Sequence, residues 1–133
     1  MMVYLLDTNI VSDLVRNPQG KAAARVKSVG DERIVTRIVV AAELRYGIAR
    51  KKSRKLATQL ELVLGDIEIL PLDIPSDETY GGIRARLEAA GTVIGHNDLL
   101  IAAHAMTLGH TLVTDNVDEF SRVAGLKIEN WLR

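Results

Sequence analysis

Near its amino end the chain has the sequence Val3-Tyr4-Leu5-Leu6-Asp7-Thr8-Asn9. A short apolar run without polar alternation is typical of a strand buried on both faces of a parallel sheet. The polar triplet that ends the run supplies helix-capping side chains, and apolar residues then recur at helical spacing, at Ile10, Val11, Leu14 and Val15. This stretch therefore predicts a buried β-strand that leads directly into an amphipathic helix.

The alternation of strands and helices continues along the chain. Further apolar runs predict strands at 33–37, 67–70, 111–114 and 127–129. Helical spacing, capping residues and glycine stops predict helices around 21–29, 40–48, 54–64, 76–90 and 96–108. Because alternating strands and helices need crossover connections, the expected fold is α/β, with a mostly parallel, roughly five-stranded sheet covered by helices on both faces.

Length and composition bound the function. The 133 residues fit one domain, 1–133. Lys plus Arg equals Asp plus Glu, at 17 each, so net charge alone indicates no polyanionic partner. The absence of cysteine excludes disulfides and thiolate metal sites. No apolar run approaches a membrane span, and the start lacks the basic segment and long apolar core of a signal peptide, so we expect a cytoplasmic protein that contacts no membrane.

Four acidic residues stand where a ligand site is expected. Asp7 and Asp115 follow predicted strands, and in an open parallel sheet ligands bind at the carboxyl ends of the strands. Asp98 lies in the first turn of a helix that is apolar almost all round. Glu43 lies inside an otherwise apolar helix beside small residues, which leave room around its carboxylate. These four residues are the candidate catalytic and metal-binding set.

Each acid also has a purely structural explanation. Asp7 and Asp115 could cap the helices that follow them, and Asp98 could complement a helix dipole. Glu43 has no capping role in mid-helix, although a buried ion pair with Arg37 or Arg45 would explain it. The functional interpretation explains all four residues at once, whereas the capping explanation must be invoked three separate times.

Electrostatics decides what four converging carboxylates would need. At an effective dielectric of ~20, four charges about 6 Å apart repel one another by roughly 17 kcal/mol in total. That matches or exceeds the stability of a whole domain, about 5–15 kcal/mol. The cluster must therefore take up protons or hold a cation. Oxygen ligands alone favour Mg²⁺ or Mn²⁺, and such an ion among carboxylates is suited to phosphodiester hydrolysis.

Four ordered motifs also carry a family resemblance. They are Leu6-Asp7-Thr8-Asn9, Ala42-Glu43-Leu44-Arg45-Tyr46-Gly47, Gly95-His96-Asn97-Asp98-Leu99-Leu100-Ile101-Ala102-Ala103-His104-Ala105 and Val113-Thr114-Asp115-Asn116. In this order they resemble the motifs of PIN-domain ribonucleases, most closely the VapC type, the toxin half of bacterial toxin–antitoxin pairs. The resemblance covers the whole chain and includes Glu119-Phe120 and the closing residues up to Trp131.

The resemblance implies a fold, an activity and a partner. The fold would be a three-layer α/β/α sandwich. The activity would be Mg²⁺- or Mn²⁺-dependent endoribonuclease cleavage of RNA, with transfer RNA the first expected substrate and inhibition of translation and growth the result. A cognate antitoxin would block the site, and the expected assembly is a homodimer or an antitoxin-bound hetero-oligomer.

The chain departs from the family pattern at two points. The family often has Ser or Thr three residues before the helix acid, where this chain has Val40. The fourth acidic ligand is also ambiguous, because Asp115, Asp118 and Glu119 could each reach a metal. The position of Asp115 at a strand end places it first, and Glu119 is the alternative.

Polar and basic residues near the motifs are candidates for substrate contact. The segment from Arg45 to Lys55 has its basic residues without an acid among them, so Lys51, Lys52 and Arg54 could track an RNA backbone. A solvated connection between helices is the alternative explanation. The remaining candidates lie beside the acids: Thr8, Asn9, His96, Asn97 and Asn116. For Thr8, helix capping is an alternative role.

Two other functions fit parts of the pattern. A phosphohydrolase with Asp7 as covalent nucleophile would need a second acid two positions on, where this chain has Asn9. A phospho-acceptor signalling domain is also doubly wound, but it would need a Lys at the end of the last strand, and Lys127 begins that strand instead. The residues therefore favour the nuclease.

Overall fold

The computed structural model describes residues 2–30 and 33–133, and its centre is a five-stranded sheet. The strands are β1 (Tyr4–Leu6), β2 (Ile34–Arg37), β3 (Glu68–Leu70), β4 (Thr111–Val113) and β5 (Ile128–Glu129). Their order is β3-β2-β1-β4-β5, and every neighbouring pair is parallel. The parallel sheet and its five strands confirm the prediction from the apolar runs.

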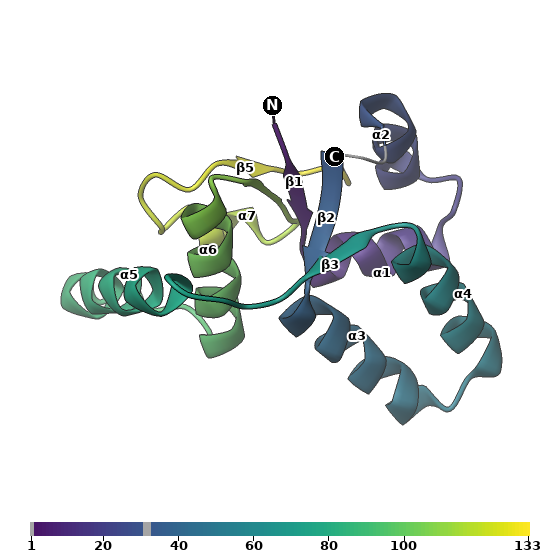
Figure 1. Ribbon diagram of the computed structural model, residues 1–133, viewed down its shortest axis with the longest axis horizontal. Coiled ribbons are helices and arrows are strands. Elements are labelled where there is room, and N and C mark those ends of the chain that lie inside the picture. The colour runs from purple at the N-terminus through teal and green to yellow at the C-terminus, as the bar shows by residue number, and fades with distance from the viewer. Residues whose placement is uncertain (1, 31–32) are drawn as a thin grey trace.

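Helices cover both sides of this sheet (Figure 1). They are α1 (Thr8–Arg16), α2 (Lys21–Val29), α3 (Ile38–Lys51), α4 (Arg54–Gly65), α5 (Ser76–Ala90), α6 (His96–Leu108) and α7 (Val117–Phe120). The helices α1 to α4 pack together on one side, and α5 packs against α6 on the other. The three-layer α/β/α architecture is confirmed.

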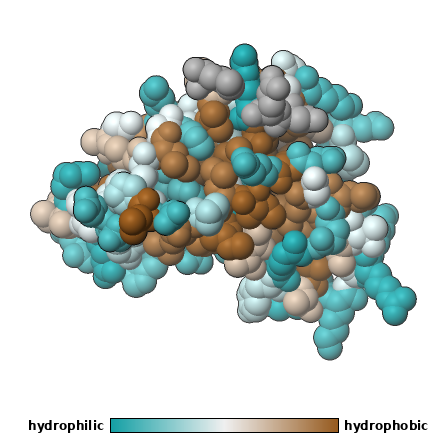
Figure 2. All heavy atoms as spheres, viewed as in Figure 1, coloured by the Kyte–Doolittle hydropathy of each residue, from teal (hydrophilic) through white to brown (hydrophobic). Residues whose placement is uncertain are grey.

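Burial follows from the apolar runs that predicted the strands. All residues of β1 and β4 are buried, and α6, which packs against α5, buries Leu99 and residues 101–105. Burying a large aliphatic side chain stabilises the fold by about 1.5–3 kcal/mol, so these central elements dominate the core. Figure 2 shows hydrophobic atoms gathered in the middle of the face on which β2 and β3 lie, with hydrophilic residues around them. Within the described ranges, no helix combines the length and apolar character that a membrane span requires.

Local signals set the helix ends. The Ser53 hydroxyl accepts a hydrogen bond from the Leu56 backbone N–H at 3.2 Å and caps α4, as predicted. Gly91 and Gly109 end α5 and α6 with φ of +70° and +68°, a conformation that a residue without Cβ adopts most easily. The short helix α7 was not predicted, because four residues are too few to show a helical period.

The topology places a ligand site between β1 and β4. From β1 the chain moves outward through β2 and β3, and then returns to place β4 on the other side of β1. The Asp7 backbone N–H donates to the Val113 carbonyl at 2.9 Å, so the ends of these two strands lie side by side. In doubly wound sheets this switch point is where ligands bind.

Candidate active site

Asp7 lies at the switch point with only 4% of its surface exposed. It is the N-cap of α1, and its Oδ1 accepts a hydrogen bond from the Thr8 backbone N–H at 2.8 Å. Its Oδ2 accepts the Thr114 hydroxyl at 2.7 Å, and Asn9 Nδ2 lies 3.4 Å away. Burial raises the pKa of Asp7, while these donors and the charge of Arg37 act in the opposite direction. Helix capping therefore explains only the Oδ1 atom of Asp7. Its Oδ2 atom belongs to the candidate site, with Thr114 and Asn9.

Glu43 enters the site from α3 and is partly buried. Thr8 Oγ1 lies 3.4 Å from its Oε1, so Thr8 contacts both Asp7 and Glu43. Burial raises the pKa of Glu43, and the negative charge of Asp7 raises it further. An ion pair with Arg45 does not explain Glu43, because Arg45 pairs with Glu61. Arg37 acts on Glu43 through its charge.

Asp98 and Glu119 form a second pair of acids, contributed by α6 and α7. Burial, a hydrogen bond with Glu119 and the charges of Glu119, Asp7 and Glu43 raise the pKa of Asp98 to about 7. Burial alone would raise the pKa of Glu119, but the Gly95 backbone N–H, at 3.0 Å, and the Asn116 side chain stabilise its charge and lower it. Asp98 therefore interacts with all three other acids, and within the pair its pKa is the one that is raised.

The fourth acid in contact with this group is Glu119. Asp115 Oδ1 instead accepts a hydrogen bond from Asn130 Nδ2 at 3.0 Å and lies 3.6 Å from Arg133 Nε. Asp118 is exposed on α7. The geometry thus favours Glu119 over Asp115, the reverse of the order given by strand position. The identity of the fourth ligand stays a prediction.

Two residues beside the acids were not predicted as part of the site. Thr114 is fully buried; its hydroxyl donates to Asp7 and accepts from the Asn116 backbone N–H at 3.0 Å. The sequence feature that could have identified Thr114 as a site residue is its position between a buried strand and Asp115. Arg37 is also fully buried, at the end of β2, and the sequence indicates it only as a possible ion-pair partner of Glu43.

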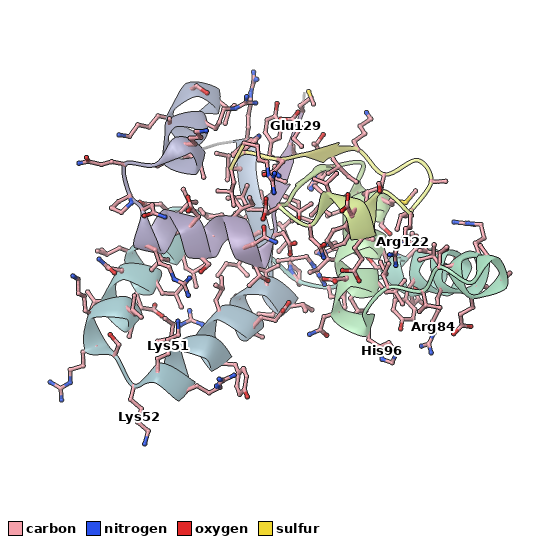
Figure 3. All side chains as sticks on the ribbon, turned by 180° about the vertical axis from the view of Figure 1, so that it is seen from behind. Lys51, Lys52, Arg84, His96, Arg122 and Glu129 are labelled. Carbon is pink, nitrogen blue, oxygen red and sulfur yellow. The ribbon has the colours of Figure 1, made fainter. Side chains whose placement is uncertain are left out.

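The other predicted residues lie at different distances from the acids. Thr8, Asn9 and Asn116 belong to the hydrogen-bond network described above, and Asn9 Oδ1 also accepts from the Asp115 backbone N–H at 3.0 Å. His96 and Asn97 are exposed in the first turn of α6. Figure 3 shows Lys51 and Lys52 around the α3–α4 turn, on the opposite side of the view from His96 and Arg122. Arg54, also exposed, begins α4.

The donor set fits a hard divalent cation. Carboxylates from four separate parts of the chain act on one another here: the charge of Asp7 raises the pKa of Glu43, and the charges of Glu119, Asp7 and Glu43 raise that of Asp98, so negative charge exceeds what Arg37 balances. In residues 2–30 and 33–133, no three His, Asp or Glu side chains are already grouped closely enough to hold an ion. The chemistry of the donors is thus the observation in favour of Mg²⁺ or Mn²⁺.

Comparisons with known proteins agree with this geometry. The PIN domain family model matches residues 4–126. Ribonuclease VapC2 of Rickettsia felis is 38% identical over 132 residues, which cover 98% of both chains. A tRNA(fMet)-specific endonuclease VapC of Shigella flexneri is 33% identical over 98% of this chain and 99% of its own.

A solved structure shows the same fold over nearly the whole chain. It is VapBC2 from Rickettsia felis bound to a DNA fragment from its promoter, with a TM-score of 0.91 and 35% identity. The match covers 98% of this chain and 99% of that one. The chain therefore belongs to the PIN domain family and, within it, to the VapC ribonucleases.

Proposed function

We propose that this chain is a metal-dependent endoribonuclease that acts as the toxin of a toxin–antitoxin pair. The observation that carries the proposal is the position of Asp98, whose pKa is raised to about 7 by burial and by three other acids from separate elements. Family membership supports RNA as the substrate. The relative named as specific for tRNA(fMet) makes transfer RNA the first substrate to examine.

The residues of the site have two expected roles, which are to bind the metal and to position the acids that bind it. Asp7, Glu43, Asp98 and Glu119 would hold Mg²⁺ or Mn²⁺, which when bound supplies positive charge and water activation for phosphodiester hydrolysis. Thr8 contacts Asp7 and Glu43 together and so fixes their spacing. The Thr114 hydroxyl holds the second oxygen of Asp7, and the Gly95 N–H holds Glu119.

The two rival functions have less support. The residue two positions after Asp7 is Asn9, which bonds Asp7 and the Asp115 backbone and cannot act as an acid. Lys127 precedes β5, whose first residue is Ile128, so no lysine stands at the end of that strand. Membership of the VapC ribonucleases also argues against both alternatives.

We expect purified protein to cleave transfer RNA only when Mg²⁺ or Mn²⁺ is present, because the carboxylates alone carry no electrophile. The measurement is cleavage of total transfer RNA with added metal, with chelator, and with chelator followed by excess metal. Activity should disappear in chelator and return with the metal. Full activity in excess chelator would contradict the proposed chemistry.

The proposed partner is a cognate antitoxin that places a basic side chain among the acids. A groove of about 200 Å³ between α1, α3 and α4 includes Glu43 and continues over Leu44, Leu56 and Leu60. It offers an apolar surface for a partner segment next to the carboxylate of Glu43. The complex of the Rickettsia felis relative with its VapB protein supports such an assembly.

The basic residues around the α3–α4 turn are expected to contact the RNA backbone. Lys51 lines the same groove as Glu43, and Lys52 and Arg54 are exposed beside it. Replacing all three with Ala should weaken RNA binding and lower the slope of log K against log salt by about 2–3. A matched triple variant at exposed Lys21, Lys27 and Lys127 should leave the slope near that of the wild type. Equal slopes in both variants would assign the first set to solvation alone.

A further inference from the structure

Arg37 is a buried cation without a bonded anion. Its side chain is fully buried, and its Nε donates to Nδ1 of His104, itself buried in α6, at 2.9 Å. Among the described residues, Nη1 and Nη2 have no hydrogen-bond partner. Buried donors of this kind are costly, and a buried charge costs more still. A residue retained at that cost needs an explanation other than packing.

The partner of Arg37 is itself uncharged. Nδ1 of His104 can accept a hydrogen bond only while it carries no proton. Burial and the charges of Arg37 and His110 lower the pKa of His104 to about 4, so the imidazole is neutral. Burial lowers the pKa of Arg37 to about 10, which leaves the guanidinium charged at neutral pH. His104 therefore anchors the guanidinium without compensating its charge.

Arg37 ends β2 beside the end of β1, where the Thr36 hydroxyl donates to the Leu6 carbonyl at 2.9 Å, so Arg37 and Asp7 follow neighbouring strand ends. The charges of Asp7 and Glu43 favour the protonated form of Arg37. We propose that Arg37 is a positioning residue, a built-in counter-cation that stabilises Asp7 and Glu43 while no metal is bound and lowers the affinity for the divalent cation that follows. The inference rests on the proposed metal-dependent function. It adds a residue that contacts neither metal nor substrate but sets the charge of their site.

The two effects of a fixed positive charge have opposite signs. It attracts the two carboxylates and so stabilises the metal-free protein, and it repels an incoming dication. Removing the charge should therefore destabilise the metal-free protein and strengthen metal binding. Because Arg37 is buried, this repulsion is screened less than it would be in water, and the change in affinity is on the order of 5–10-fold or more.

The test compares Arg37→Met with Arg37→Lys by thermal unfolding near pH 8, in chelator and across a Mn²⁺ titration. Arg37→Met should lose more stability in chelator than in Mn²⁺, and its half-saturating Mn²⁺ concentration should fall on the order of 5–10-fold. Arg37→Lys keeps the charge and should retain the wild-type titration. If Arg37→Met lowers the melting temperature equally with and without Mn²⁺, Arg37 is only a packing residue and the inference is wrong.

A second variant covers the case in which Arg37→Met does not fold alone. The charge-balanced double variant Arg37→Met/Glu43→Gln removes the cation together with one of its acids, and it should be more stable in chelator than Arg37→Met. A double variant no more stable than the single one would overturn the inference. If the wild type itself does not respond to Mn²⁺, the proposed metal site fails. If the wild type responds and Arg37→Met responds identically, only the role of Arg37 fails.

Discussion

Asp98→Asn is expected to reduce RNA cleavage on the order of 10³-fold or more while the protein stays folded. Asparagine keeps the size of the side chain but removes the carboxylate that interacts with Glu119, Asp7 and Glu43. Asp7→Asn should have a comparable effect, because Asp7 is the buried acid at the switch point. Single-turnover cleavage at saturating Mg²⁺ measures the loss, and circular dichroism checks the fold.

The matched control for Asp98 is an acid outside the cluster. Asp118 is exposed on α7, next in sequence to Glu119, and its backbone carbonyl accepts a hydrogen bond from Ser121. Asp118→Asn should therefore leave cleavage within a few-fold of the wild type. If Asp98→Asn were as active as Asp118→Asn, the carboxylate of Asp98 would have no part in the reaction.

Glu119→Gln is expected to reduce cleavage on the order of 10²-fold, whereas Asp115→Asn should cost only a few-fold. Glu119 interacts with Asp98 and raises its pKa, while Asp115 accepts a hydrogen bond from Asn130 and lies near Arg133. Both variants convert an acid to its amide, so they differ only in position. The comparison uses the same single-turnover assay. The opposite ranking would return Asp115 to the metal site and leave Glu119 as a partner of the Gly95 backbone.

The fold could be predicted because its signals are local. Tyr4–Leu6 and Thr111–Val113 are continuous apolar runs, and the structure buries every residue of both. His96–Leu108 is apolar almost all round, and the helix has these bounds. A segment that is apolar throughout is stable only in the interior of the protein. The composition of such a segment is therefore enough to identify it as a core strand or helix.

The details of the site could not be predicted, because they depend on contacts between distant segments. Asp115 turns to Asn130, fifteen positions further along the chain, and no periodicity signals that contact. The hydroxyl of Thr114 reaches Asp7 across the β1–β4 junction. Arg37 reaches His104 across the interior between β2 and α6. Val40, where the family often has a hydroxyl, is fully buried in the core.

The pH dependence of stability follows from the raised pKa values. Asp7, Glu43 and Asp98 have folded-state pKa values above the unfolded values of about 4. Between about pH 4 and pH 7 these three acids bind more protons in the folded metal-free protein than in the unfolded chain, so their contribution to stability falls as pH rises. The lowered pKa values of His104, about 4, and of His110 act in the opposite direction below about pH 6.5, so the comparison of the wild type with Asp98→Asn isolates the contribution of the acids. The lowered pKa of Glu119 acts in the opposite direction, but in the range below its usual value.

Thermal unfolding of the wild type and Asp98→Asn near pH 5 and pH 8, with chelator or Mn²⁺, tests most directly whether the acids form one cation site. We expect Mn²⁺ to raise the wild-type melting temperature near pH 8 and to change it little near pH 5, where protons already compensate the charge. In chelator near pH 8, Asp98→Asn should melt higher than the wild type, by roughly 3–5 °C for each kcal/mol of repulsion relieved. If Asp98→Asn instead lowers the metal-free melting temperature and Mn²⁺ shifts neither protein, the acids are separate structural residues and there is no shared metal site.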